Sequence, residues 1–414
     1  MEKELRKQVL ELQERLGQGR ITRREFLRCV TLLGLSLAAA KVLAACRPAP
    51  SPTPTSAPPT PEEKGTEAAP EEAEVPSAYV HEAMWYTPLS DNRVQCQLCP
   101  NRCLSQEGQR GICEVRENRG GKLYTLVYGN PCAVHIDPIE KKPFNHFLPA
   151  TIALSLATVG CNFDCAYCQN WQISQARPEE VKGYDLPPEK VVETALEKDC
   201  QSIAYTYTEP TIFYEYMLDT AKLARAKGLR NVIITNGFIN PEPLRELCQY
   251  VDGIRVDLKA FDEEFYIKVS QGRLEPVLET LKIIQEEGVH LEIINLVVPT
   301  LNDDPEEIRQ MCQWIKENLG LDVPLHFSRF LPMYKLQSLP PTPIETLETA
   351  HKIALEEGLH YVYIGNVPGH PAENTYCSKC GELLIKRRGF YVLENHIIDG
   401  KCEYCGEPIP GVWE

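Results

Sequence analysis

From residue 151 onward the chain alternates short apolar runs with amphipathic stretches. The apolar runs are rich in Val, Ile and Tyr and read TIALSLATV, SIAYTYTE, NVIITNG, DGIRVDLKA, HLEIINLVVP, PLHFSRFLP and, at 361–366, YVYIGN. Helical stretches lie near residues 188–199, 211–227, 241–250, 275–287, 305–318 and 344–357. This alternation predicts a parallel sheet with right-handed crossovers. We expect an α/β fold, a partial (β/α)6 barrel, with its functional residues at the carboxyl ends of the strands.

Residues 1–46 have the pattern of an export signal. Thr22-Arg23-Arg24 precedes an apolar run from Val30 to Ala45, which is shorter than a comfortable bilayer span. The paired arginines resemble a twin-arginine signal, and Leu43-Ala44-Ala45-Cys46 resembles a lipobox. We expect export and a membrane tether through a lipidated Cys46, and a cytoplasmic protein with an amphipathic leader is the alternative.

Composition divides the remaining chain and limits its partners. Residues 47–76 hold nine prolines among small and polar residues, which predicts a disordered linker. We expect an N-terminal cysteine module at 77–150, the barrel at 151–366 and a C-terminal cysteine module at 367–414. The net charge of −15 argues against a nucleic-acid partner. Most of the 17 cysteines fall into close-set groups, a spacing that indicates metal ligands rather than disulfides.

The loop after the first barrel strand reads GCNFDCAYCQ, with Cys161, Cys165 and Cys168 at the spacing C-x3-C-x2-C. A four-iron cluster takes four cysteine ligands, so three thiolates leave one iron open. A structural zinc loop is the alternative, although a zinc site normally closes with four ligands.

This loop resembles that of the radical S-adenosylmethionine (SAM) superfamily. The resemblance implies a [4Fe-4S] cluster whose open iron chelates the amino and carboxylate groups of SAM. One electron then cleaves SAM to methionine and a 5′-deoxyadenosyl radical, which abstracts hydrogen from a substrate. The resemblance also implies an electron donor of the flavodoxin or ferredoxin type and a cofactor contact at Tyr167.

The ends of the second and third strands carry further candidate SAM contacts. Glu209 occupies the place of the superfamily's Gly-Gly-Glu motif, in which Tyr207 and Thr208 replace the two glycines. A carboxylate there is placed to bind the ammonium group of SAM, and a helix-capping role is the alternative. Asn236 precedes a flexible glycine that allows close approach to a ligand.

The later strands supply four more candidates. Asp257 and Lys259 face the same side of their strand and resemble the Asp-Leu-Lys run that lies beside SAM in glycyl-radical activating enzymes. A structural ion pair is the alternative. Val298 begins a stretch similar to the one that packs against the adenine in the superfamily. His326 is a candidate contact of SAM or substrate, with a core histidine as the alternative.

Two further cysteine groups flank the predicted barrel. The N-terminal group is Cys96, Cys99, Cys103 and Cys113, and the C-terminal group is Cys377, Cys380, Cys402 and Cys405. The N-terminal spacing suits zinc or a second iron-sulfur cluster, and the sequence leaves both open. The C-terminal group forms two Cys-x2-Cys-Gly knuckles, which predict a structural or docking zinc ribbon, with a rubredoxin-like single iron as the alternative.

The segment His135–Pro149, HIDPIEKKPFNHFLP, carries many charged side chains. We expect a solvated charged hairpin that borders the mouth of the active site. Its polar residues are His135, Asp137, Glu140, Lys141, Lys142 and His146.

The joint pattern across residues 78–414 resembles the radical SAM enzyme of the AmmeMemoRadiSam system, which is itself similar to pyruvate formate-lyase activating enzymes. This resemblance implies companions of the Memo and Ammecr1 types but fixes no substrate. Three hypotheses follow. The chain is a radical SAM enzyme acting on an unidentified protein or small molecule, a glycyl-radical activase, or a non-enzymatic, membrane-tethered metalloprotein that relays electrons or docks a partner.

Overall fold

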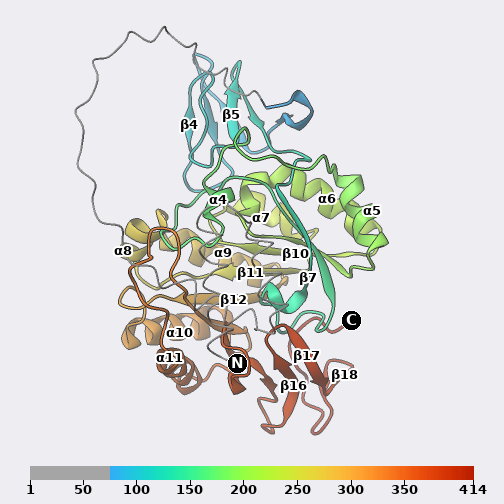
Figure 1. The fold of residues 1–414 in the computed structure, drawn as a ribbon, viewed down its shortest axis with the longest axis vertical. Coiled ribbons are helices and arrows are strands. Elements are labelled where there is room, and N and C mark those ends of the chain that lie inside the picture. The colour runs from blue at the N-terminus through green and yellow to red at the C-terminus, as the bar shows by residue number, and fades with distance from the viewer. Residues whose placement is uncertain (1–74) are drawn as a thin grey trace, which may run out of the picture. The chain divides into compact units, whose positions relative to one another are not determined.

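The computed structural model describes residues 75–414, which are built on one eight-stranded sheet (Figure 1). The strand order is β14-β13-β12-β11-β10-β9-β8-β7. All neighbours from β8 to β14 are parallel. These strands are β8 (Ile152–Ala157), β9 (Ser202–Tyr205), β10 (Arg230–Thr235), β11 (Gly253–Asp257), β12 (His290–Val297), β13 (Leu325–Arg329) and β14 (Val362–Gly365). The predicted α/β fold is confirmed, and each predicted apolar run contains a strand.

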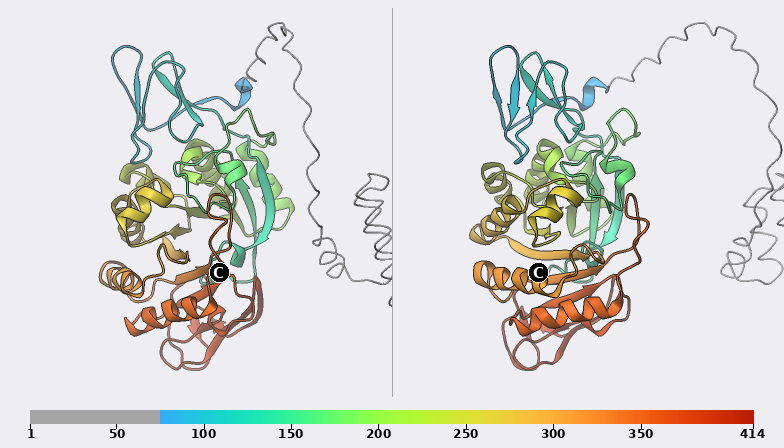
Figure 2. Two further views of the ribbon diagram at one scale, coloured as in Figure 1. Left: turned by 60° about the vertical axis from the view of Figure 1, so that its left-hand side comes forward. Right: turned by 90° about the vertical axis from the view of Figure 1, so that its left-hand side faces the viewer.

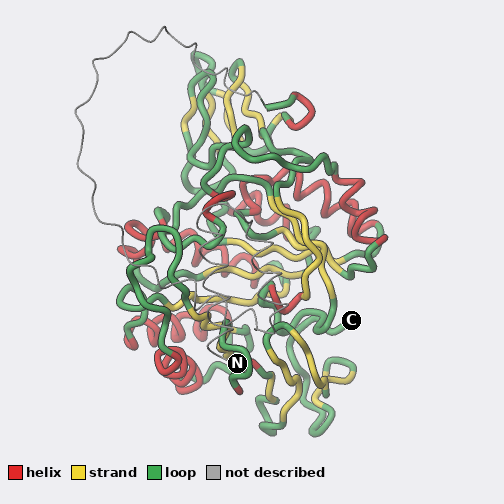
Figure 3. Tube along the Cα trace, viewed as in Figure 1, coloured by secondary structure: helices red, strands yellow, loops and turns green. Residues whose placement is uncertain are grey.

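The helices follow the strands as the periodicity predicts (Figure 3). The long helices are α5 (Pro188–Glu197), α6 (Tyr214–Ala226), α7 (Pro241–Cys248), α9 (Leu274–Glu286), α10 (Pro305–Leu319) and α11 (Ile344–Glu356). Shorter turns are α4 (Trp171–Ser174), η3 (Pro210–Phe213), α8 (Glu263–Phe265) and η4 (Tyr266–Ser270). The start of helix α10 is defined by the two residues at its N-terminus. Asp304 caps the backbone N–H groups of residues 306 and 307, and Pro305 needs no such partner.

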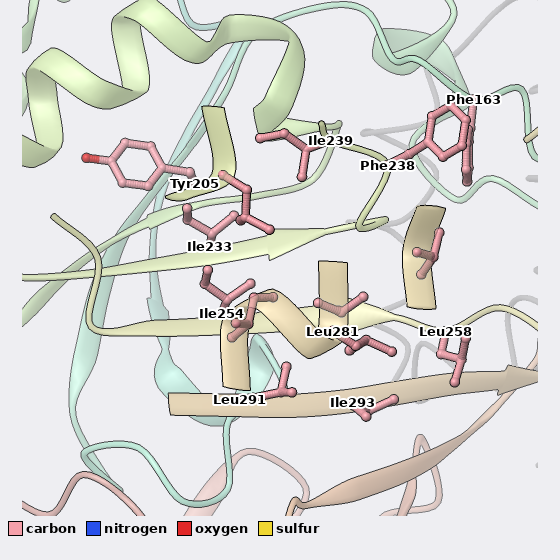
Figure 4. Packing of buried hydrophobic residues seen from close by; sticks show 14 of the residues in the cluster. Phe163, Tyr205, Ile233, Phe238, Ile239, Ile254, Leu258, Leu281, Leu291 and Ile293 are labelled. Carbon is pink, nitrogen blue, oxygen red and sulfur yellow. The ribbon is translucent and has the colours of Figure 1, made fainter. Parts of the chain in front are cut away.

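The two faces of the sheet are different. Because the parallel strands lie in sequence order, all right-handed crossovers pass on one face, and the helices cover it. Figure 4 shows part of the core formed there, including Ile233 of β10, Ile254 of β11 and Leu281 of α9. Side chains alternate along a strand, so neighbouring residues such as Arg255 face the opposite, inner face. Polar side chains can therefore gather on the inner face without disturbing the core.

An antiparallel strand, β7 (Ala133–Pro138), followed by η2 (Ile139–Lys141), forms the eighth strand and was not predicted. The expectation of a solvated hairpin at His135–Pro149 is wrong for most of its charged residues. Pairing with β8 brings Asp137, Glu140, Lys142 and His146 into the interior. Each finds a partner there, as when Lys142 Nζ lies 2.6 Å from Asp137. Only His135 and Lys141 of this polar set stay exposed.

A buried carboxylate, Glu292 of β12, holds the inner face to the η2 region. It accepts hydrogen bonds from the backbone N–H groups of Asn145 (3.0 Å) and His146 (2.8 Å). The imidazoles of His290 (3.1 Å) and His326 (2.6 Å) also contact it. Burial alone would raise the pKa of Glu292, but the two histidines outweigh it and hold the pKa well below its ordinary value.

Two small modules extend the sheet domain, which lies between them in Figures 1 and 2. The N-terminal module has η1 (Ser77–Tyr79), a sheet of β1 (His81–Glu82), β6 (Lys122–Thr125) and β5 (Arg116–Arg119), and a sheet of β2 (Tyr86–Pro88), β3 (Val94–Cys96) and β4 (Leu104–Ser105). The C-terminal module has η5 (Pro371–Glu373), a sheet of β15 (Thr375–Tyr376), β16 (Leu383–Arg388) and β17 (Tyr391–Asn395), and a pair of β18 (Ile397–Ile398) and β19 (Lys401–Cys402).

The predicted signal at 1–46 lies outside the described residues, as does all of the predicted linker except residues 75 and 76. Among residues 75–414, no helix combines the length and the apolar character that crossing a membrane requires.

Replacing Glu292 should destabilise the fold strongly. The change Glu292→Ala leaves two buried N–H groups and two imidazoles without their acceptor, so we expect the free energy of unfolding to fall by about 3–5 kcal/mol. Because the folded-state pKa is depressed, the contribution of Glu292 is present above its unfolded pKa of about 4.3 and is lost as pH falls below it.

Chemical denaturation followed by circular dichroism at two pH values measures this effect. The control is Glu306→Ala, which removes an exposed carboxylate from α10. Equal losses of stability in the two variants would contradict the assignment.

Candidate active site at the carboxyl ends of the strands

A cavity of about 530 Å³ lies at the carboxyl ends of the parallel strands. It brings together most of the residues that the sequence singled out, namely Cys161, Cys165, Tyr167, Cys168, Glu209, Asn236, Asp257 and Lys259. Its volume is in the range of sites for small molecules and cofactors. The strand ends therefore meet around a space that can hold a ligand.

The cluster loop, residues 160–169, is held by its backbone against the surrounding elements. The N–H of Asp164 donates to the carbonyl of Ser270 (3.1 Å), and that of Ala166 donates to the carbonyl of Val269 (2.8 Å). Gly160 has φ +96°, and a Cβ there would lie 2.6 Å from the carbonyl oxygen of Cys113. The loop thus starts at a position where only glycine fits.

The three loop thiols fit a polynuclear metal cluster. Burial raises the pKa of the Cys161 and Cys165 thiols, so thiolates here need a neighbouring cation. Within residues 75–414, ligand atoms of three or more candidate residues come within 4.8 Å of one another only in the C-terminal cysteine group. The loop thiols therefore surround a space rather than a single ion. If these thiols hold a [4Fe-4S] cluster, the cluster would supply the electron that cleaves SAM.

Glu209 connects the ends of β9 and β10. Its carboxylate accepts hydrogen bonds from the backbone N–H groups of Thr211 (3.0 Å) and Asn236 (2.8 Å) and from Thr235 Oγ1 (2.6 Å). Burial raises its pKa, although these hydrogen bonds oppose the rise. The hydrogen bond to Thr211 caps η3, as the alternative prediction for Glu209 expected. The same side chain also lines the cavity.

Asn236 fixes the cluster loop to the end of β10. Its amide donates to Asn162 Oδ1 (2.7 Å) and accepts from the N–H of Phe238 (2.9 Å). Asn162 in turn donates to the carbonyl of Phe238 (2.9 Å). Because Asn162 directly follows Cys161, this network sets the position of a predicted cluster ligand relative to the strand ends.

Tyr207, which replaces a glycine of the superfamily motif, keeps a left-handed backbone with φ +65°. This conformation costs a non-glycine residue about 1–2 kcal/mol. Its carbonyl accepts from Asn170 (2.7 Å), its hydroxyl donates to Asp137, and Lys142 Nζ lies 4.4 Å from the centre of its ring. Tyr207 and Lys142 therefore lie together on the polar part of the cavity wall.

Asp257 lies between two cations at the end of β11. Arg255 is 2.7 Å away and Lys259 is 3.1 Å away. Burial alone would raise the pKa of Asp257, but both cations lower it. The structure thus contains the predicted ion pair of Asp257 with Lys259, and both residues also line the cavity. Sequence analysis overlooked Arg255, although the alternation that placed Asp257 and Lys259 on one face also places Arg255 there.

Two predicted site residues do not line the cavity. Val298 is fully buried in the main core, and its N–H donates to Asn302 in a tight turn (2.6 Å). His326 lies deeper inside the sheet, where it contacts Glu292 and stacks on Tyr363 with ring centres 4.9 Å apart. The alternative of a core histidine describes it. Ser328, two residues further along β13, is the residue of that strand that reaches the cavity.

The C-terminal cysteines form a separate, compact group. The Sγ atoms of Cys377 and Cys405 are 3.6 Å apart, and those of Cys380 and Cys402 are 3.8 Å apart. These four residues do not line the cavity described above. They can hold one metal ion, at a distance from the strand ends.

Comparison with known proteins agrees with this geometry. Residues 155–314 match the model of the Radical SAM superfamily. The uncharacterized protein MJ0808 of Methanocaldococcus jannaschii is 50% identical over 335 residues, which are 80% of this chain and 99% of that protein. The pyruvate formate-lyase-activating enzyme of Clostridium pasteurianum is 25% identical over 166 residues, 38% of this chain and 66% of that enzyme.

One further relative and one solved structure are also similar to this chain. The putative glycyl-radical enzyme activating enzyme MJ1632 of M. jannaschii is 25% identical over 220 residues, 52% of this chain and 79% of that protein. The crystal structure of a radical SAM methyltransferase from Sphaerobacter thermophilus covers 91% of this chain and 97% of its own, with 12% identity and a TM-score of 0.43.

The chain belongs to the radical SAM superfamily. It is an enzyme that cleaves SAM reductively with an iron-sulfur cluster, and it is homologous to pyruvate formate-lyase activating enzymes.

Removing the cation at Lys259 should weaken SAM binding. The change Lys259→Met deletes a buried ammonium beside Asp257, and we expect the KM for SAM to rise about tenfold, the effect of losing one charged hydrogen bond. Steady-state kinetics of SAM cleavage with dithionite measures it. Lys268→Met, which removes an exposed ammonium from η4, is the matched control. An unchanged KM in the Lys259 variant would show that this side chain does not contact SAM.

Proposed function

We propose that this enzyme uses the SAM-derived radical to abstract a hydrogen atom from a separate substrate inside the cavity. The observation that carries the proposal is that the cavity extends beyond the three cysteines. Its wall continues to Ser328, Asn366 and Phe390, on elements that follow the SAM-binding motifs in the sequence. A substrate that contacts these residues would lie in the same cavity as SAM.

A glycyl-radical activase is the second candidate. Six of the relatives similar to this chain are named pyruvate formate-lyase-activating enzyme or putative glycyl-radical enzyme activating enzyme. In this case the substrate is a glycine of a partner protein, presented as a loop at the mouth of the cavity.

The wider assignment is to the AmmeMemoRadiSam system, with companions of the Memo and Ammecr1 types. The sequence pattern across residues 78–414 supports it, and the match with MJ0808 over 335 residues is longer than the predicted barrel at 151–366. A reduced flavodoxin or ferredoxin serves as electron donor in this proposal. The pattern of residues 1–46 supports export and anchoring at a lipidated Cys46, where mass spectrometry of the mature N-terminus provides the test.

Transfer of deuterium tests hydrogen abstraction without knowing the substrate. The reconstituted enzyme is incubated anaerobically with dithionite, SAM and a fully deuterated extract of cells that contain its partners. We expect 5′-deoxyadenosine that carries deuterium, detected by mass spectrometry, because the hydrogen comes from the substrate.

Cys168→Ala should yield no 5′-deoxyadenosine, and Cys132→Ser, which changes a cysteine outside the three groups, should match the wild type. Product without deuterium would contradict the proposal. In a parallel mixture prepared with an undeuterated extract, a glycyl-radical doublet in the electron paramagnetic resonance spectrum would select the activase, because the splitting comes from the hydrogen that remains on the glycine Cα.

We further propose that the C-terminal cysteines bind structural zinc. Zn–S bonds of about 2.3 Å in a tetrahedron place sulfurs about 3.8 Å apart, in agreement with the observed 3.6 and 3.8 Å. The change Cys402→Ser should remove about one zinc per chain in elemental analysis and lower the melting temperature of the C-terminal module. SAM cleavage should persist, because the site lies outside the cavity. Iron in place of zinc would support the rubredoxin-like alternative.

A further inference from the structure

The four cysteines of the N-terminal module surround a second cavity. Cys96 ends β3, Cys99 and Cys103 lie in the turn that leads to β4, and Cys113 lies shortly before β5. All four line one space of about 20 Å³. A single water needs about 10–15 Å³ on this scale. The space between the thiols is therefore larger than one water.

The arrangement differs from that of the C-terminal cysteines. There, pairs of sulfurs are 3.6 and 3.8 Å apart, as a single tetrahedral ion requires. Among residues 75–414, the C-terminal group alone brings three or more ligand atoms within 4.8 Å of one another. The N-terminal thiols are therefore spread around their cavity. A cluster binds its cysteines on different irons and needs this wider spacing, whereas zinc needs the closer one.

The wall of the second cavity suits a buried cluster. Leu98, Leu123 and Ile212 provide apolar surface, which excludes water. The backbone N–H of Ile112 points at Cys103 Sγ (3.4 Å), a contact that stabilises a metal-bound sulfur. Arg116, which is 2% exposed and forms an ion pair with Glu215 (3.0 Å), also lines the space.

The second cavity is next to the cluster loop. Asn162 lines it, while its neighbours Cys161 and Phe163 line the SAM cavity. Asn101 donates to the carbonyl of Asn162 (3.1 Å). The backbone of Gly160 also packs against the carbonyl of Cys113 so closely that a Cβ would lie 2.6 Å from it. The two cavities are therefore adjacent, and residues 161–163 of the cluster loop contribute to the walls of both.

We propose that Cys96, Cys99, Cys103 and Cys113 bind a second iron-sulfur cluster, which delivers electrons to the cluster held by Cys161, Cys165 and Cys168. A reduced flavodoxin or ferredoxin gives one electron to the second cluster and is itself oxidised. The second cluster passes this electron to the SAM-binding cluster and returns to its oxidised state. No covalent bond is made or broken in the relay.

Metal analysis of variants tests the site independently of catalysis. The full chain is reconstituted anaerobically with iron and sulfide, and the triple variant Cys161→Ala, Cys165→Ala, Cys168→Ala is prepared in the same way. We expect the triple variant to retain iron and sulfide with a Mössbauer signature of a cluster ligated by four cysteines. A triple variant that contains two zinc ions and no iron would overturn the proposal.

A second variant covers the case in which the triple variant does not fold. The intact chain should contain more iron than the about four irons of a single [4Fe-4S] cluster. Changing Cys99 and Cys103 to Ala should lower its iron content to about four per chain. The matched control, Cys200→Ala with Cys248→Ala, changes two cysteines outside all three cysteine groups and should keep the wild-type iron content. Equal iron in both double variants would contradict the second cluster.

The relay has its own readout. With a reduced flavodoxin as donor, the Cys99, Cys103 variant should form 5′-deoxyadenosine at least tenfold more slowly than the wild type. With dithionite, a small reductant that reaches the SAM-binding cluster directly, the two rates should agree. Equal rates with flavodoxin would refute the relay, while a loss of activity with both donors would show that the module supports the fold rather than electron transfer.

Discussion

The active site depends on one missing protein ligand, because three cysteines bind a cluster of four irons. A cluster that lacks a protein ligand must be kept from closing with another side chain and must face a space where SAM binds. The chain meets both needs with a short loop fixed by backbone hydrogen bonds to residues 269 and 270 and opening on the 530 Å³ cavity. The parallel sheet supplies the rest, because all its strands end at that cavity.

Buried polar contacts hold the cluster loop and the strand ends in position relative to one another. Glu209 connects two strand ends, and Asn236 connects one of them to Asn162 beside the first cluster cysteine. Deeper in the sheet, Glu292 connects the inner face to the unexpected strand β7 and the turn after it. Each of these groups would be costly to bury alone, and each is paired. These hydrogen bonds fix the strand ends, the cluster loop and the turn after β7 relative to one another.

The sequence predicted the parallel strands and long helices because their periodicity is local. It also predicted the cluster loop and the residues Glu209, Asp257 and Lys259, which local motifs mark. The sequence predictions were wrong where a residue's role depends on its place in the tertiary structure. His326 is on the inner face of its strand but lies too deep to reach the cavity, and Ser328 lines the cavity instead. Asp137 and Lys142 read as solvated charges, since their burial depends on an antiparallel pairing that no local pattern reveals.

An open iron held through Cys161, Cys165 and Cys168 should bind the amino and carboxylate groups of SAM. Electron paramagnetic resonance of the reduced enzyme, combined with electron-nuclear double resonance, detects these bonds. With SAM labelled by ¹⁵N in its amino group and ¹⁷O in its carboxylate, we expect the signal of this cluster to change and to show coupling to both labels. A spectrum that is unaltered by SAM and has no such coupling, while the cluster is intact, would contradict it.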